Sequence, residues 1–446
     1  MGRITKSVFT GGAAALILAG ISEPAAAAVS EESAYVFNTL LFLIGGFLVM
    51  FMAAGFCMLE AGLVRSKNVA TICLKNISLY AISGLMFFIV GYNLMYGIDE
   101  GGFIGSFMPF IPDDAAALAA ENPAFGEGDG YAASSDWFFQ MVFCATTASI
   151  VSGTLAERIK VWPFLIFTAV LTGIIYPIEG SWQWGGGFLS AMGFSDFAGS
   201  TIVHSAGGWA ALTGAILLGA RTGKFGADGR INPIPGSNLP LATLGTFILW
   251  LGWFGFNGGS QLALGSAANA VAVSNIFINT NIAAAAGTVA AMLLTQVIYK
   301  KVDLTMALNG ALAGLVSITA EPLTPTLGSA AAIGAVGGIL VVIFVPLLDK
   351  LKIDDVVGAI SVHLVAGIWG TMAVPITNAD TSFGTQFIGV ISIGAFVAIA
   401  SFIVWGILKA TIGIRCSQEE EYAGLDKTEL GLEAYPEFGR GSQTVT

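Results

Sequence analysis

The stretch DFAGSTIVHSAGG, residues 196–208, holds one of the only two histidines in this chain, and DDVVGAISVHLVAG, residues 354–367, holds the other. When His204 is aligned with His363, both stretches read D-x-x-G-x-x-x-V-H-x-x-x-G. Each stretch opens an apolar segment long enough to cross a bilayer as a helix. The same motif therefore begins two membrane-crossing segments, and each carries an ionisable ring into an apolar interior.

The composition of the 446-residue chain is that of a membrane protein. Hydrophobic residues make up 55% of the chain and charged residues 11%, whereas soluble globular proteins carry about 25% charged residues. The 58 glycines suit helices that pack closely in lipid through small residues. We therefore predict an all-α polytopic membrane protein that is surrounded by lipid and has no nucleic-acid partner.

The first 28 residues have the pattern of a secretory signal peptide. Arg3 and Lys6 precede an apolar run from Val8 to Ile21, and an alanine-rich end follows at residues 25–28. Cleavage near that end would leave the mature N-terminus outside the cytoplasm. A first anchor helix that is retained is the alternative.

Apolar runs of about 20 residues predict eleven bilayer-crossing helices in a membrane domain over residues 29–412. A cytoplasmic tail is expected over residues 413–446. The expected spans are 37–62, 76–97, 134–155, 161–180, 199–219, 239–259, 273–299, 304–323, 329–348, 357–376 and 385–412.

The basic residues indicate which way the chain is threaded. Apart from those of the first 28 residues, every Lys and Arg follows an odd-numbered span or lies in the tail, so the N-terminus is expected outside and the C-terminus inside. The outer loop over 97–133 is acidic, which either favours cations at the mouth or reflects threading alone. The basic residues after spans 1, 3, 5, 7 and 9, and those at or after the end of span 11, are, in order, Arg65, Lys67, Lys75; Arg158, Lys160; Arg221, Lys224, Arg230; Lys300, Lys301; Lys350, Lys352; and Lys409, Arg415, Lys427, Arg440.

The two histidine motifs open spans 5 and 10, so they enter the membrane from opposite sides. This predicts an inverted repeat of five plus five helices, about 37–219 and 239–376, with an eleventh helix at about 385–412. The stretches VSGT (151–154) and VSIT (316–319) are a weaker echo of the repeat. Each motif aspartate is expected to cap a helix start, and both histidines should then meet near mid-depth.

A single histidine on an apolar helix is commonly a satisfied core residue. Two at equivalent places in inverted repeats instead indicate a pathway, because intramembrane ionisable groups are costly and usually functional. No Cys or further His falls in matching spans, so we expect neither a metal site nor another cofactor. We predict that His204 and His363 touch, line a narrow pore and accept a hydrogen bond from a small polar solute or relay its proton.

Aromatic residues are expected at the outer end of the pore. Phe139 and Phe143 are one helical turn apart and share a face. Phe256 and Ser260 end span 6, and Trp184 lies in the loop before span 5. Aromatic faces attract cations, although an interfacial aromatic belt is the alternative for each of these residues.

Six motifs together resemble those of the ammonium transporter family, in its bacterial branch. They occur in the family's order, and the resemblance as a whole covers all eleven predicted spans and runs into the tail. They are WFFQMVF (137–143), SGTLAERIK (152–160), WQWGGG (182–187), DFAGSTIVH (196–204), WFGFNGGS (253–260) and DDVVGAISVH (354–363).

The resemblance implies a homotrimer in the cell inner membrane, with one pore per subunit, that takes ammonium or methylammonium. It also implies site roles. The cation would be recruited by Trp184, Phe143 and Ser260 with Asp196 beneath them; Phe143 and Phe256, with Phe139, would gate the pore; and His204, His363 and Thr319 would line it.

The tail stretch GLDKTE (424–429) resembles the family's cytoplasmic regulatory segment, which implies regulatory roles for Asp426 and Thr428 and a possible PII signalling protein as partner. Two positions depart from the family pattern. Leu430 stands where a histidine is usual, and so does Ser181 in the expected outer loop. These departures bear on the tuning of the tail and the loop rather than on the pore.

We predict an ammonium transporter or channel. An ammonium sensor with little flux is the alternative from another class, although the acidic tail of about thirty residues carries no signalling domain. A gas channel for ammonia or carbon dioxide is a third possibility, which Trp184 and Ser260 disfavour. An enzyme is the least expected, because no nucleophile–base pair or metal set falls at one depth.

Overall fold

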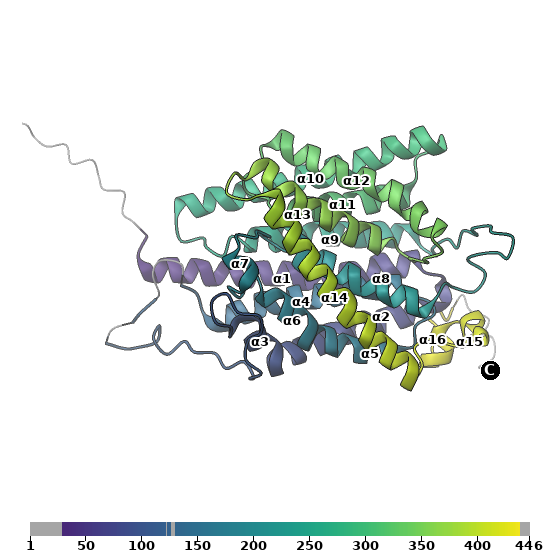
Figure 1. Ribbon diagram of the computed structural model, residues 1–446, viewed down its shortest axis with the longest axis horizontal. Coiled ribbons are helices and arrows are strands. Elements are labelled where there is room, and N and C mark those ends of the chain that lie inside the picture. Colours follow the sequence, from purple (N-terminus) through teal and green to yellow (C-terminus); the bar gives the residue numbers. More distant parts are fainter. Residues whose placement is uncertain (1–28, 122, 126–129, 438–446) are drawn as a thin grey trace, which may run out of the picture.

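The computed structural model describes residues 29–121, 123–125 and 130–437, and within these residues it contains helices and no strands. The predicted signal peptide at 1–28 and the last nine residues of the tail lie outside the described residues. The long helices run side by side (Figure 1), with α3 and α7 at one end of the bundle and the tail helices α15 and α16 at the other.

The first half of the bundle contains several helices interrupted by single π-helical turns. Such turns are frequent at functional sites. The elements are α1 (Glu31–Leu63), η1 (Ser66–Asn68), α2 (Val69–Met86), η2 (Phe87–Gly91), α3 (Tyr92–Tyr96), α4 (Ala133–Thr154), α5 (Val161–Val170), η3 (Leu171–Ile175), α6 (Tyr176–Ser181), α7 (Phe188–Ala191), η4 (Ser200–Ser205) and α8 (Ala206–Leu218).

The second half mirrors this plan and adds one long helix and the tail. Its elements are α9 (Leu239–Gly259), α10 (Ala267–Tyr299), α11 (Leu304–Thr319), α12 (Leu327–Lys350), η5 (Ile360–Val365), α13 (Ala366–Thr377), α14 (Phe383–Thr411), α15 (Gln418–Ala423) and α16 (Leu425–Leu430).

Each of the eleven predicted spans overlaps one of these continuous helical runs. Nine of the described runs are long and apolar enough to cross a membrane, which makes this a multi-pass membrane protein. The two that fall short are α11, with 16 residues, and α4. Both are largely enclosed by other helices: every residue of α11 from Ala307 to Thr319 is buried. A helix enclosed in this way does not need an apolar surface towards lipid.

The position of one basic residue differs from the prediction. Lys75 was expected in the loop between spans 1 and 2, but α2 already begins at Val69, and Lys75 is buried within it. Its Nζ donates to the carbonyl oxygen of Ser152 at 2.9 Å and lies 4.7 Å from the centre of the Phe164 ring. These partners let the helix continue through the lysine, so Lys75 does not contribute loop charge to the prediction of sidedness.

The two histidine segments run in opposite directions. Before η4, the backbone nitrogen of Ser195 donates to Gln386 Oε1 at the start of α14. After α8, Arg221 pairs with Asp354, which lies just before η5. Thus η4 begins at the end of the bundle where α13 leads into α14, and η5 begins at the end where α8 finishes. This is the opposed threading that an inverted repeat requires.

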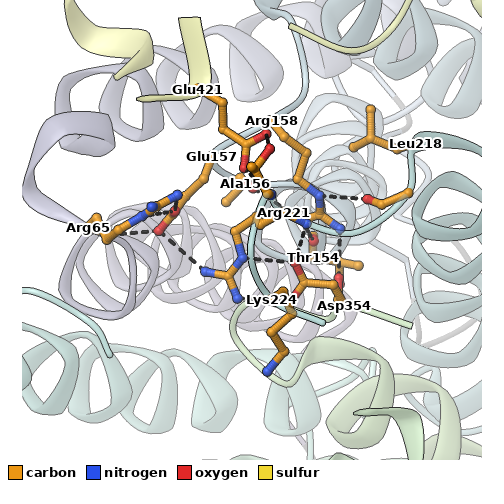
Figure 2. A network of polar contacts seen from close by, with 12 residues as sticks. Arg65, Thr154, Ala156, Glu157, Arg158, Leu218, Arg221, Lys224, Asp354 and Glu421 are labelled. Atoms are coloured by element: carbon orange, nitrogen blue, oxygen red, sulfur yellow. Dashed lines mark hydrogen bonds and ion pairs between the residues drawn. The ribbon is translucent and has the colours of Figure 1, made fainter. Parts of the chain in front are cut away.

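A buried charge network ties the loops together at the tail end of the bundle (Figure 2). The Nε of Arg221 donates to Asp354 at 2.9 Å, and another of its nitrogens lies 3.5 Å from Glu157. Arg65 also pairs with Glu157. The buried Arg158 donates to the carbonyl oxygen of Asp354 at 2.7 Å. The network therefore joins the segments that follow α1, α4 and α8 to the segment that leads into η5.

Asp354→Asn should destabilise the protein by about 3 kcal/mol at neutral pH, because it removes the closer of the two charge partners of the buried Arg221. The measurement is unfolding of the detergent-solubilised protein. Asp228→Asn is the control; it breaks an exposed ion pair with Arg230 and should change stability by less than about 0.5 kcal/mol. Equal effects of the two variants would contradict the buried pairing.

The same variant has an expected pH dependence. Burial raises the pKa of the Asp354 carboxyl, but the hydrogen bond of Arg221 and the charges of Arg158 and Arg221 outweigh burial and hold the pKa well below its usual range. A depressed pKa contributes stability above the unfolded value of about 4, and that stability is lost only as pH falls through the folded value. The difference between wild type and Asp354→Asn should therefore be constant from about pH 8 to about pH 5.

Candidate functional site

Each histidine sits on a π-helical turn that an aspartate caps. Asp196 accepts four backbone N–H hydrogen bonds, from residues 199 to 202, at 2.8–3.0 Å. Asp355 accepts two from residues 359 and 360, at 3.1 and 2.8 Å. Gly199 and Gly358 have φ of 105° and 83°, a region that favours glycine. The predicted caps are therefore present, and both copies of the motif fold in the same way.

The two histidine rings are in contact. The Nδ1 atoms of His204 and His363 are 3.1 Å apart, and the rings lie nearly parallel with centres 5.2 Å apart. Both residues are buried, at 0% and 3% exposure. Such a contact needs one donor and one acceptor, so the two neutral rings carry their protons on different nitrogens. The predicted contact between the histidines is confirmed.

Glycines allow the two segments to approach. A Cβ at Gly208 would lie 2.7 Å from the backbone nitrogen of Leu364, and one at Gly367 would collide with the carbonyl oxygen of Ser200. Real side chains do not fit at such distances, so both motif glycines are required for the crossing of the two segments. The crossing in turn fixes the separation of the histidines, which lie one turn before these glycines.

Two neighbouring aromatic rings pack against His204. Its ring stacks on Trp253 with centres 5.0 Å apart and on Phe256 at 5.3 Å. Trp253 Nε1 donates to Thr319 Oγ1 at 2.8 Å, so the threonine orients the tryptophan that faces the histidine. Within the described residues, His204 Nε2 is buried without a hydrogen-bond partner. A buried nitrogen of this kind is available to a small polar solute.

A second aromatic pair lies directly beyond His204. Phe143 stacks on Phe256 with centres 4.0 Å apart and an interplanar angle of 27°. Phe139 packs against Phe143 at 4.8 Å. All three rings are buried. The residues predicted to form a gate therefore form one continuous group of rings that ends at the histidine.

A cavity of about 400 Å³ opens on the other side of the phenylalanine pair. Trp184, Phe139, Phe143 and Ser260 all line it, so the structure brings together the predicted recruitment residues. Asp196 is fully buried and does not line the cavity. It is connected to the cavity through Trp184, whose Nε1 donates to the carbonyl oxygen of Asp196 at 2.8 Å.

The cavity also contains polar residues that the sequence reasoning missed. Asp136 lies in its wall, accepts from Gln140 Nε2 at 3.0 Å and pairs with the hydroxyl of Tyr92. Tyr96 and Tyr131 complete this group. A signal was available, because residues 136, 140 and 143 are spaced three and four apart and so share one face of α4.

The tail contacts the bundle through Asp426. Its carboxylate accepts from the backbone nitrogens of residues 70 and 71 at 2.9 and 2.7 Å, at the start of α2. Thr428 is exposed, and its hydroxyl donates to the carbonyl oxygen of Gly424 at 3.1 Å. Leu430 ends α16 and is half-buried. Ser181 was expected in a loop, but it is the buried last residue of α6 and donates to a carbonyl oxygen within that helix.

Comparison with known proteins agrees with this geometry. The family model described as Ammonium Transporter Family matches residues 40–435. The chain belongs to the ammonium transporter family. Its members are transporters and channels rather than enzymes.

Two relatives illustrate the similarity in sequence. The chain is 44% identical over 427 residues to ammonium transporter Amt2 of Archaeoglobus fulgidus, covering 89% of this chain and 87% of the relative. It is 38% identical to ammonium transporter Amt1 of Haloferax mediterranei, covering 90% and 80%.

Solved structures share the fold. The structure of a protein called Sensor Amt Protein superposes with a TM-score of 0.82 at 38% identity, covering 90% of this chain and 100% of that one. The crystal structure of Candida albicans Mep2 superposes with a TM-score of 0.76 at 25% identity, covering 87% and 88%.

Proposed function

We propose that this chain recruits the ammonium cation in the cavity lined by Trp184, Phe143 and Ser260, removes a proton there, and conducts ammonia past the twin histidines. The observation that carries the proposal is the unbroken order of groups. The cavity is followed by the stacked pair Phe143–Phe256, and Phe256 in turn packs on His204, which touches His363.

The energetics favour a neutral solute in the narrow part. Moving a bare monovalent cation into an apolar medium costs tens of kcal/mol, and aromatic faces offset about 0.5–2 kcal/mol. Ammonium can avoid this cost by giving up a proton at the mouth, whereas potassium has none to give. The free nitrogen of His204 then supplies a hydrogen bond to ammonia. The pore would thus select by acidity as well as by size.

The setting of the pore is also proposed. The cavity end would face outwards and the tail end the cytoplasm, with eleven spans, a cleaved signal peptide, the cell inner membrane as location and a homotrimer as assembly. The docked tail borders a cavity of about 390 Å³ lined by Lys67, Asp426 and Tyr435 among others. This surface is where a PII signalling protein would meet the chain, and the exposed Thr428 is a candidate for modification.

A sensor is the second candidate, since a structural relative at 38% identity is called Sensor Amt Protein. The two functions differ in flux. Methylammonium uptake by a transporter-deficient strain that expresses this chain would support transport, and binding without uptake would favour the sensor.

Trp184→Leu should raise the ammonium concentration for half-maximal transport about 5- to 30-fold, which corresponds to a lost cation–π contact of about 1–2 kcal/mol. The maximal rate should change little, because the gate and the histidines are untouched. Trp162→Leu is the matched control, since Trp162 is 72% exposed and lies away from the cavity. An unchanged half-saturation in Trp184→Leu would contradict recruitment at this site.

His204→Ala tests whether a proton follows through the histidine pair. If it does, ammonium-driven current across a reconstituted bilayer should fall at least about tenfold, because proton relay by a side chain contributes that much or more. Methylammonium uptake measured in the same preparation separates a blocked pore from a lost relay. An unchanged current would count against the relay.

A further inference from the structure

The inverted repeat relates α1 to α9. Residues of α9 that border the outer cavity therefore have counterparts in α1 on the inner side of the histidine pair. Phe256 packs on His204 at 5.3 Å, and Phe56 packs on His363 at 6.0 Å. Glycines precede both phenylalanines in the sequence. Four residues after Phe256, at the outer cavity, stands a serine; four residues after Phe56 stands Glu60. The repeat therefore puts a carboxylate at the inner position that corresponds to Ser260.

The packing of the two helices supports this correspondence. Gly45 lies against the carbonyl oxygen of Gly255, and Gly55 lies against that of Gly245; the Cβ atoms they lack would be 3.3 and 3.1 Å from those oxygens. The sequence offset that relates Phe56 to Phe256 also relates Gly45 to Gly245 and Gly55 to Gly255, so each of the two contacts corresponds to the other in the repeat. The helices cross symmetrically, so the ring of each faces the histidine of one half.

Glu60 and His363 line the same small cavity on the inner side of the histidine pair. Its volume is about 10 Å³, which is room for about one water molecule. Phe56, Asn309 and Ser149 also line it. A solute the size of ammonia that leaves His363 in the inward direction would therefore meet Glu60 next.

One oxygen of Glu60 is held and the other is free. Oε2 accepts from Ser152 Oγ at 2.7 Å and from Asn76 Nδ2 at 3.2 Å. Glu60 is only 1% exposed, so water does not cover its side chain. Within the described residues, its Oε1 has no hydrogen-bond partner. A buried carboxyl oxygen is costly to leave unpaired, and the cavity is the place where a ligand would pair it.

A positive charge lies close to this carboxyl group. The Nζ of Lys75 donates to the carbonyl oxygen of Ser152, the same residue whose hydroxyl donates to Glu60. Lys75 is itself 1% exposed. Lys75 thus donates to Ser152 rather than to Glu60, and the free oxygen of Glu60 stays open to a ligand.

We propose that Glu60 is an inner station where ammonia that has passed His363 is protonated and held as ammonium before release. The proposal rests on the function proposed above and deepens it. The Glu60 carboxylic acid gives its proton to ammonia, the N–H bond forms as the O–H bond breaks, and the carboxylate holds the resulting cation by charge. After ammonium leaves, the carboxylate is reprotonated by hydronium from the solution on the tail side, which leaves water and restores the acid.

Glu60→Gln tests the station, because glutamine keeps the shape and can accept from Ser152 and Asn76 but has no proton to transfer. Ammonium transport by proteoliposomes should fall about tenfold or more, while Glu60→Asp should keep a substantial part of it. Glu321→Gln is the control, since Glu321 is buried just after α11, both of its carboxyl oxygens accept hydrogen bonds, and it does not line the cavity; it should transport like the wild type.

A spectroscopic measurement separates proton transfer from a structural role. Addition of ammonium to the wild type should change the infrared band of a protonated carboxyl group, and this change should be missing in Glu60→Gln and present in Glu321→Gln. If Glu60→Gln does not fold, Ser152→Ala, which removes one hydrogen bond to Oε2, should shift the same band. The inference would be overturned if a folded Glu60→Gln variant transported ammonium at the wild-type rate. It would also be overturned if both glutamine variants lost transport to the same extent. A wild-type protein that moves no ammonium would instead overturn the proposed function.

Discussion

The hydrogen bond between the two imidazole rings connects the two halves of the inverted repeat. It joins residues 159 positions apart in the chain, at the crossing of segments that run in opposite directions. The crossing is possible because glycines remove two side chains from it, and it is rigid because an aspartate caps each segment at its start. When two neutral rings share one proton between their Nδ1 atoms, one of the two Nε2 atoms is a donor and the other is an acceptor.

The two sides of this pair are built from the same plan with different chemistry. On the outer side, Trp253 and Phe256 cover His204. The cavity beyond them is lined by tyrosines, an aspartate and a serine. On the tail side, one phenylalanine and one glutamate border a space no larger than a water molecule. The repeat thus supplies symmetric positions for the rings, while the residues that surround them differ between the two sides.

The sequence predicted the features that repeat and missed those that depend on helix rotation. The histidine contact and the aspartate caps followed from one motif in two opposed copies. The sequence did not reveal that Trp253 packs on His204 or that Asp136 lines the outer cavity. The pattern of a helix that is apolar on all sides does not show which face turns towards the histidines. Lys75 was assigned to a loop for a related reason: a charge in an apolar run looks like the end of a span until a buried partner is known. Ser181 was assigned to a loop although its helix continues to it.

The most direct test of the central claim uses the fact that the chain has only two histidines. Nitrogen NMR of the protein in lipid, labelled with ¹⁵N-histidine, would then contain the signals of this pair alone. We expect one ring protonated at Nδ1, one ring unprotonated there, and a scalar coupling between the two nitrogens across their hydrogen bond. Two rings protonated at Nδ1, or two Nδ1 nitrogens without coupling, would contradict it.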